Sequence, residues 1–415
     1  ADYWALQWSD LLRVDRLKLG HENAHLYYKW IRNAFVRNKP LDDVARELLT
    51  AEGPLTEQPA GFFYRAANGT GDMAAMVSQV FLGVRIACAE CHQHPYDRWT
   101  QQDYHAMRGF FQQVSTKPST GGLSLLAEGS PVIKHPRTGK VIQPYPLGTE
   151  MPEKAPEGDR RRVLADWMTA PENPWFSRNL ANRLWAHFFG RGLVMPVDDL
   201  RETNPPSNPE LLEELGQRFS KSGYNFKQLV RDICNSRTYQ RTVQSNDSNR
   251  GDTRNFAKAS IRRVRAEVLL DIISQVTNTK NKFKGLPNGS SAVEIVDGKT
   301  STFFLTTFGR ATRDTVCSCE VALEPNLSQA LHLLNGSTVN SKCTQGGVVA
   351  KALAAKKTPS EIIDDLYMRC LARKPIATEK EKLMAFVGEE GRSDADVLND
   401  LFWAVLNSKE FIFNH

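Results

Sequence analysis

The feature that most constrains the fold is an apolar pattern of helical period that runs through most of the chain. Three early segments place apolar residues three or four positions apart, on one face of a helix: 4–12, 27–35 and 41–49. The third begins after Pro40 and is closed by Gly53-Pro54, so its start and stop are also indicated. We therefore expect about four helices in residues 3–114, and a further helix running from about Asp72 towards Cys88.

A second helical block is predicted from residue 159 to residue 243, and the tail of the chain has the same pattern. In the second block, Ser207-Asn208-Pro209-Glu210 supplies a capping residue, a proline for the first turn and an acid, so a helix begins there. In the tail, residues 378–381 and 393–396 resemble capping boxes, and residues 398–406 carry a helical apolar stripe.

Two stretches depart from the helical pattern. Residues 116–158 are rich in Pro, Gly, Ser and Thr, and within them residues 132–142 alternate around a Thr-Gly turn, which predicts a small β-hairpin inside a linker. Minor β content is expected near 290–310, in the segments 293–296 and 302–305. The predicted fold is therefore mainly α, with helical domains at 1–115 and 159–415 joined by the linker.

Length and composition indicate a globular protein of more than one domain. A chain of 415 residues is too long for one ordinary core, and 41% hydrophobic and 24% charged residues are typical of soluble domains. The longest apolar runs, such as 266–276, are interrupted by charge, so no membrane span is expected. The net charge of +6 arises from 53 basic and 47 acidic residues mixed along the chain, and no nucleic-acid partner is predicted. No nucleophile elbow, Walker loop or His-Glu-x-x-His motif occurs.

The seven cysteines are an odd and sparse set that does not predict a disulfide framework. Three of them lie in apolar or helical surroundings, which predicts packing in the core: Cys234, Cys343 and Cys370. Cys317 and Cys319 are separated by one residue. This spacing is compatible with two thiolates at one metal, with a reactive pair or with two free thiols, and a direct disulfide between them would be strained. The chain begins with Ala-Asp-Tyr-Trp, which suggests a processed protein or part of a longer one.

The segment Cys88-Ala89-Glu90-Cys91-His92 has the pattern of a covalent attachment site for c-type haem. Attachment needs two thiols spaced to reach the two vinyl groups and an imidazole directly after the second thiol to ligate the iron. Cys88, Cys91 and His92 meet these requirements. The alternative is a zinc or non-haem iron site that takes thiolates from Cys88 and Cys91, nitrogen from His92 or His94, and the rest from the Cys317/Cys319 pair.

Other residues near this segment are candidates for supporting roles. A predicted helix just beyond it places Tyr104, Met107 and Phe111 on one face. Met107 is a candidate axial ligand, although such a methionine is more often a core residue. His105 lies on a different face and is expected at the surface. His94 follows His92 too closely to reach the far face of a haem, so we expect it to hydrogen-bond a propionate or to bind a separate metal.

Residues 81–99 closely resemble the planctomycete cytochrome c-like domain, a domain of unknown function. The second half of the chain resembles the usual C-terminal companion of that domain in six stretches: 179–194, 204–212, 262–267, 317–320, 329–335 and 406–411. The resemblance covers nearly all of the chain and implies the paired domains of unknown function 1549 and 1553, as the C-terminal part of a longer precursor. It also implies export, since such proteins often carry a signal peptide.

We therefore expect an exported, periplasmic or extracellular, monohaem c-type protein that transfers electrons or performs small-molecule redox chemistry. The sequence does not identify its redox partner and does not decide whether the protein is an enzyme. It allows the chain to be a subunit of a larger extracytoplasmic complex. The alternative is a structural or binding module with a zinc or non-haem iron site. A third hypothesis, an enzyme acting on acidic or sulfated glycans, is permitted by acids such as Asp198 and Asp199, which are ordinarily surface residues.

Overall fold

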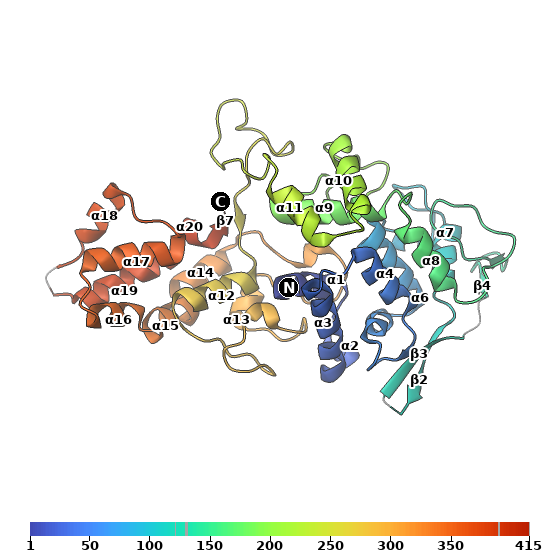
Figure 1. Ribbon diagram of the computed structural model, residues 1–415, viewed down its shortest axis with the longest axis horizontal. Helices are drawn as coiled ribbons and strands as arrows, with labels where there is room; N and C mark the ends of the chain where they lie inside the picture. Colours follow the sequence, from blue (N-terminus) through green and yellow to red (C-terminus); the bar gives the residue numbers. More distant parts are fainter. Residues whose placement is uncertain (121, 129–131, 389–390, 415) are drawn as a thin grey trace. The chain divides into compact units, whose positions relative to one another are not determined.

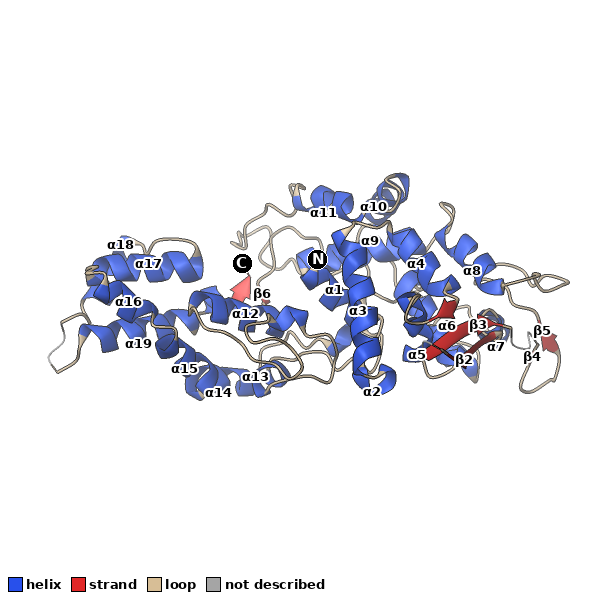
Figure 2. Ribbon diagram, turned by 60° about the horizontal axis from the view of Figure 1, so that its bottom comes forward, coloured by secondary structure: helices blue, strands red, loops and turns tan. Residues whose placement is uncertain are grey.

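The computed structural model describes residues 1–120, 122–128, 132–388 and 391–414. Within these ranges the chain is mostly helical, and its strands form small antiparallel sheets (Figure 2). The expected class, mainly α with minor β, is confirmed. The chain divides into two compact units. Unit 1 comprises Ala1–Ser260, Val296–Lys299 and Arg313–Ser318, and unit 2 comprises Ile261–Ile295, Thr300–Thr312 and the chain from Cys319 onwards.

Unit 1 is built mainly from helices that share one hydrophobic core. These helices are α1 (Asp2–Leu11), α2 (Arg16–Leu19), α3 (His21–Val36), α4 (Leu41–Thr50), η1 (Pro59–Gly61), α5 (Phe62–Ala66), α6 (Thr70–Val77), η2 (Ser78–Leu82), η3 (Ala87–Glu90), α7 (Gln101–Gly109), α8 (Arg160–Thr169), α9 (Phe176–Phe189), α10 (Pro209–Lys221) and α11 (Phe226–Cys234). Helix α4 packs against α8, and α9 contacts both α10 and α11 (Figure 1).

Aromatic contacts explain why the helices after residue 159 belong to unit 1. The ring of Phe176 on α9 lies 6.4 Å from that of Phe81, and the ring of Phe226 on α11 lies 4.6 Å from that of Trp4 on α1. Burying large aromatic surfaces dominates the energetics of a core. The compact units therefore do not follow the boundary expected at residue 159, because helices from both sides of the linker bury their apolar faces against each other.

Two small sheets lie in unit 1. Their strands are β1 (Gly53–Pro54), β2 (Val114–Ser119), β3 (Gly122–Ala127), β4 (Ile133–Lys134) and β5 (Val141–Ile142). Strands β4 and β5 pair with Ile133 opposite Ile142, which confirms the hairpin expected around the Thr-Gly turn. The sheet ordered β1-β3-β2 was not expected, because β2 and β3 come from the part of the linker without clear alternation.

Unit 2 has a core of its own, formed by helices from α12 to α20. Its elements are β6 (Arg262–Arg263), α12 (Ala266–Val276), η4 (Ala292–Glu294), α13 (Phe303–Thr307), α14 (Leu327–Asn335), α15 (Ser337–Gln345), α16 (Val348–Ala354), α17 (Pro359–Leu371), α18 (Ala377–Met384), α19 (Asp394–Leu406), α20 (Lys409–Ile412) and β7 (Phe413–Asn414). The short helix η5 (Ser318–Glu320) begins at the last residue of unit 1 and continues into unit 2. No helix in the described ranges is both long and apolar enough to cross a membrane.

The prediction of strands near 290–310 is wrong, because each of the two segments contributes to a short helix instead. Ser291 and Glu294 form a capping box that starts the 3-10 helix η4. Thr302 accepts a hydrogen bond from the backbone N–H of Leu305 and starts α13. The rings of Phe304 and Phe308 stack at 4.3 Å, four residues apart. Local capping thus outweighs the strand preference of the β-branched and aromatic residues.

Replacing Gly346 with alanine is expected to destabilise unit 2 by about 3 kcal/mol, because the interior there is already full. A Cβ at this position would lie 1.5 Å from the carbonyl oxygen of Thr277, a distance that only a backbone movement can relieve. Denaturant titration measures the effect. Gly251→Ala is the matched control, since a Cβ there meets no atom within 4 Å. Equal stability of the two variants would contradict the packing described for Gly346.

Candidate functional site

The Cys-x-x-Cys-His segment follows a sharp change of direction at Gly83. The helix that includes α6 and η2 ends there, with Gly83 at a φ of 67°, and its carbonyl accepts a hydrogen bond from the backbone N–H of Leu200 at 2.7 Å. A Cβ on Gly83 would lie 2.6 Å from side-chain atoms of Asn179 and Leu200. The expected helix from Asp72 towards Cys88 is therefore too long. Cys88 lies instead on the separate 3-10 helix η3.

A buried carboxylate holds the chain just before the cysteines. Asp198 is fully buried, accepts a hydrogen bond from Gln79 Nε2 at 2.8 Å and forms an ion pair with Arg85. Burial by itself raises the pKa of Asp198, but Arg183, Gln79 and Arg85 together outweigh it and lower the pKa. Arg183 also donates to the carbonyl of Gln79 at 2.8 Å. The segment is thus anchored to α9 and to the loop that follows it.

Both thiols and the imidazole of the motif lie at the surface. Cys88 and Cys91 are exposed free thiols, and His92 is exposed as well, whereas Ala89 between the cysteines is fully buried. His92 Nδ1 lies 2.7 Å from the carbonyl oxygen of Gln93. A carbonyl only accepts, so Nδ1 carries the proton and Nε2 presents its lone pair. The motif therefore offers two accessible sulfurs and one oriented nitrogen ligand.

His94 has a structural role in the turn behind the motif. It is buried, its backbone N–H donates to the carbonyl of Trp99 at 2.8 Å, and its Nδ1 accepts from the backbone N–H of Tyr96 at 3.3 Å. The guanidinium of Arg201 lies 5.3 Å from the ring centroid of Tyr96. These contacts turn His94 inwards, away from solvent, while His92 stays exposed.

The helix α7 behind the motif is packed on more than one side. Tyr104, Met107 and Phe111 are all buried, as expected for residues on one face. Met107 is fully buried among core side chains, whereas His92 is at the surface. The expectation that His105 is a surface residue is wrong, because it is 4% exposed and its ring lies 6.2 Å from that of His135 in the β4-β5 hairpin. Neither ring nitrogen of His105 has a hydrogen-bond partner among the described residues, and burial lowers its pKa.

Glu90, the acid within the motif, has a hydrogen-bond partner that the sequence did not predict. The hydroxyl of Tyr104 forms a hydrogen bond with the side chain of Glu90, which lies between the two cysteines, and burial together with Glu90 raises the pKa of Tyr104. A Cβ on Gly71 would lie 2.5 Å from that hydroxyl. No periodic sequence pattern links Glu90 to Tyr104. Their contact is therefore visible only in the packing of α6, α7 and η3.

The second cysteine pair does not consist of free thiols. Cys317 and Cys319 are each disulfide-bonded. The expectation that they supply free thiolates is therefore wrong. Among the residues that the structure describes, no three His, Cys, Asp or Glu side chains come together in an arrangement that can hold a metal ion.

The two acids considered for a glycan-cleaving site are structural. Asp198 is the buried anchor described above, and Asp199 is 5% exposed with its carboxylate 3.5 Å from Arg201. Their expected surface placement is wrong. Each carboxylate is engaged by an arginine of the same unit, so both contribute to the loop that supports the motif.

Comparison with known proteins assigns the family. The sequence model of PSD1, a protein of unknown function (DUF1553), matches residues 160–387, which is more than half of the chain. The chain belongs to the PSD1 family. A second family model, PSCyt2, a protein of unknown function (DUF1549), matches residues 1–116 and so includes the Cys-x-x-Cys-His motif. No curated protein and no solved structure is significantly similar to the chain.

The PSD1 match extends over both compact units. Residues 160–260 of the match pack with the PSCyt2 segment in unit 1, and most of the remainder forms unit 2. The pairing of the two domains of unknown function, expected from the sequence, is confirmed. In this PSD1 protein the first helices of the PSD1 segment, especially α9, build the platform on which the PSCyt2 motif lies.

Proposed function

We propose that this chain is an exported monohaem c-type protein, in which Cys88 and Cys91 hold the porphyrin through thioether bonds and His92 ligates the iron through Nε2. The observation that carries the proposal is the state of the motif: two exposed free thiols followed by an imidazole whose Nδ1 is held by a carbonyl. Proximal histidines are oriented in this way by a hydrogen bond from the other ring nitrogen. The resemblance of residues 81–99 to the planctomycete cytochrome c-like domain supports export of the chain.

The contacts that hold the motif in place would also support a bound redox group. Bound haem supplies one-electron transfer between ferric and ferrous iron. The chain's own contribution is to keep the attachment segment rigid, through Asp198, Arg85 and the turn at Gly83, so that His92 stays oriented. Because the motif is exposed, a partner protein or a small molecule has direct access. We propose electron transfer or small-molecule redox chemistry, in the periplasm or outside the cell.

The non-haem metal site has less support than the haem site. It drew on six candidate ligands, of which Cys317 and Cys319 are each disulfide-bonded and His94 is turned inwards. Two thiolates and His92 would remain. Elemental analysis distinguishes the alternatives, since zinc without porphyrin supports the metal module and iron with porphyrin supports the haem protein.

Expression with export and a haem-attachment system is expected to yield one covalent haem per chain. The absorption spectrum should show a Soret band, the pyridine haemochrome should be of c type, and the denatured chain should gain the mass of one haem. Cys88→Ser with Cys91→Ser should abolish the mass gain, because no sulfur remains to form a thioether. Cys234→Ser, which replaces a free cysteine outside the motif, should leave it unchanged.

Two results would contradict the proposal. One is a fully matured wild-type chain without a Soret band. The other is covalent haem retained by the double serine variant. His92→Ala adds an independent readout, since it should keep the thioethers and the mass gain while changing the ligand-sensitive bands of the spectrum.

A further inference from the structure

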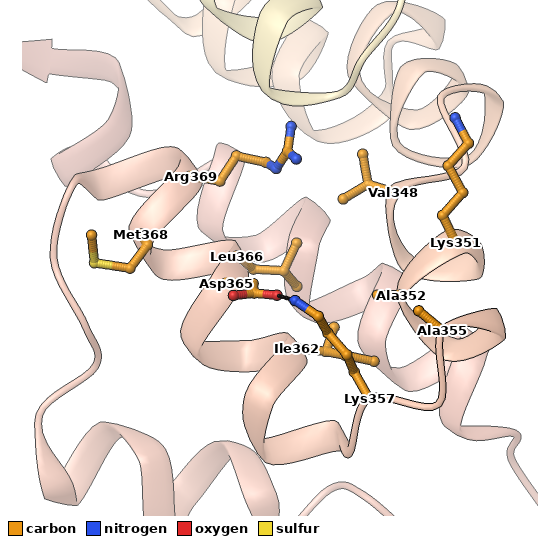
Figure 3. Close-up of a pocket in the computed structure, with 10 residues that line it drawn as sticks. All are labelled: Val348, Lys351, Ala352, Ala355, Lys357, Ile362, Asp365, Leu366, Met368 and Arg369. Carbon is orange, nitrogen blue, oxygen red and sulfur yellow. Dashed lines mark hydrogen bonds and ion pairs between the residues drawn. The ribbon is translucent and has the colours of Figure 1, made fainter.

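A cavity in unit 2 has an apolar floor and a basic rim. It measures about 640 Å³ and opens between α16 and α17 (Figure 3). This volume falls within the range of small-molecule sites, roughly 300–1,000 Å³. Ile362 and Leu366 form part of the floor and are 1% and 2% exposed, so they also belong to the hydrophobic core of the unit. Val348, Ala352, Ala355 and Met368 are the other apolar residues that line it. We call this cavity the basic pocket.

The charges around the basic pocket are not balanced. Its lining includes three cations, Lys351, Lys357 and Arg369, and one acid, Asp365. Asp365 forms an ion pair with Lys357, as the dashed line in Figure 3 marks. Neighbouring Asp364 is paired with a lysine outside the pocket at 2.7 Å. The two acids of this stretch of α17 are therefore already engaged.

Lys351 and Arg369 hold the uncompensated charge. Lys351 Nζ donates to the carbonyl of Gly346 at 3.4 Å, and Arg369 donates to the carbonyl of Val276 at 3.3 Å. Neither residue forms an ion pair with an acid in the described part of the chain. An ammonium has three donors and a guanidinium five, so both retain donors for a ligand. In Figure 3 their charged ends lie on either side of Val348, apart from the Lys357-Asp365 pair.

We propose that the basic pocket binds a small organic anion, with an apolar body against the half-exposed Val348 and Ala352 and an anionic head between Lys351 and Arg369. A neutral apolar molecule would cover the apolar lining but leave the two positive charges without a counterion. An inorganic anion would neutralise the charge but would not cover the half-exposed Val348 and Ala352. Only a molecule with both parts satisfies the whole lining, because burial of apolar surface and charge-assisted hydrogen bonds then act together.

Titration calorimetry of the full chain tests the proposal with two probes, octanoate and octyl sulfate, each below its micellar concentration. Saturable binding of one molecule per chain is expected for at least one of them, and the difference between them assigns a carboxylate or a sulfate head. Octan-1-ol and inorganic sulfate, which each lack one part, should bind at least tenfold more weakly. Equal affinity for octan-1-ol would overturn the proposal, as would the absence of saturable binding by both anions.

Variants locate the binding site. Lys351→Gln with Arg369→Gln should weaken binding about tenfold, as expected for losing two partly exposed ion pairs. Lys374→Gln removes the same kind of charge from an exposed position outside the pocket and should leave affinity within twofold of wild type. Ala352→Phe fills the pocket without changing its charge and should abolish binding, which keeps the test valid if the double variant is unstable. Unchanged affinity in Ala352→Phe would also overturn the proposal.

Discussion

Replacing Glu267 with glutamine is expected to lower the free energy of unfolding of unit 2 by about 3–5 kcal/mol, the usual cost of removing one partner from a buried ion pair. Glu267 is fully buried at the start of α12 and lies 2.8 Å from Arg265 Nε and 3.1 Å from Arg310 Nε. Both arginines are themselves 7% exposed or less. Without the carboxylate, two buried positive charges lose their counterion.

The same carboxylate makes unit 2 sensitive to acid. Burial by itself raises the pKa of Glu267, but Arg265 and Arg310 outweigh it and lower the pKa to about 2, from an ordinary value of 4.5. Because the folded pKa lies below the unfolded one, the carboxylate stabilises the fold above about pH 4.5. That stabilisation is lost progressively as the pH falls to about 2. The Glu267→Gln variant should lack this part of the pH dependence.

Hydrogen exchange with mass spectrometry is the appropriate measurement, because it reports on the two units separately. Amides of α12 and the segments around Arg310 should exchange faster in Glu267→Gln, while those of unit 1 should not change. Glu324→Gln is the matched control, since Glu324 is an exposed acid of the same unit. If Glu267→Gln and Glu324→Gln are equally stable at pH 7, the buried ion cluster does not stabilise unit 2 as we infer.

The second large effect is expected from Asp198→Asn in unit 1. The variant should lose about 3–5 kcal/mol of stability, because an amide cannot neutralise Arg85 and the half-buried Arg183, and the NH₂ group of the new side chain would face other hydrogen-bond donors. Asp198 joins α9 and its following loop to the segment before Cys88, and Gln79 Nε2 also donates to it. Loosening of residues 83–92 should therefore accompany the loss.

Amide exchange of residues 83–92 measures that loosening, and denaturant titration measures the stability. Asp166→Asn provides the control, since Asp166 forms an exposed ion pair with Arg46 whose removal should cost no more than about 1 kcal/mol. In the haem-loaded chain, Asp198→Asn should still carry one covalent haem, because the thiols are intact. A variant with wild-type stability and unchanged exchange would show that Asp198 does not anchor the motif.

Local interactions account for what sequence patterns predicted correctly. Helix α10 begins where expected because Asn208 accepts a hydrogen bond from the backbone N–H of Leu211, and α19 begins after Ser393 for the same reason. The β4-β5 hairpin forms around a turn in which Gly139 has a φ of 68°. In each case the deciding residues lie within a few positions of one another, so a short window of sequence contains the cause.

Sequence patterns were insufficient where segments distant in the chain determine how a residue is buried. His105 is buried because the β4-β5 hairpin covers a second side of α7. The compact units do not divide at residue 159, although the two family matches do, because Phe176 and Phe226 complete the core begun by the first helices. Such contacts join residues many positions apart, and no periodicity within a single helix specifies which other segment will cover it.

The sequence by itself determined the helical class, several helix starts and the candidate motif Cys88, Cys91 and His92, because spacing along the chain suffices for capping and for the reach of two thiols. Only the tertiary structure decided how that motif is supported. Asp198 lies 113 residues from Arg85 in the chain yet forms an ion pair with it, and the orientation of His92 depends on one backbone carbonyl. Long-range burial and hydrogen-bond geometry are properties of the packed chain, so they appear only when the helices are assembled.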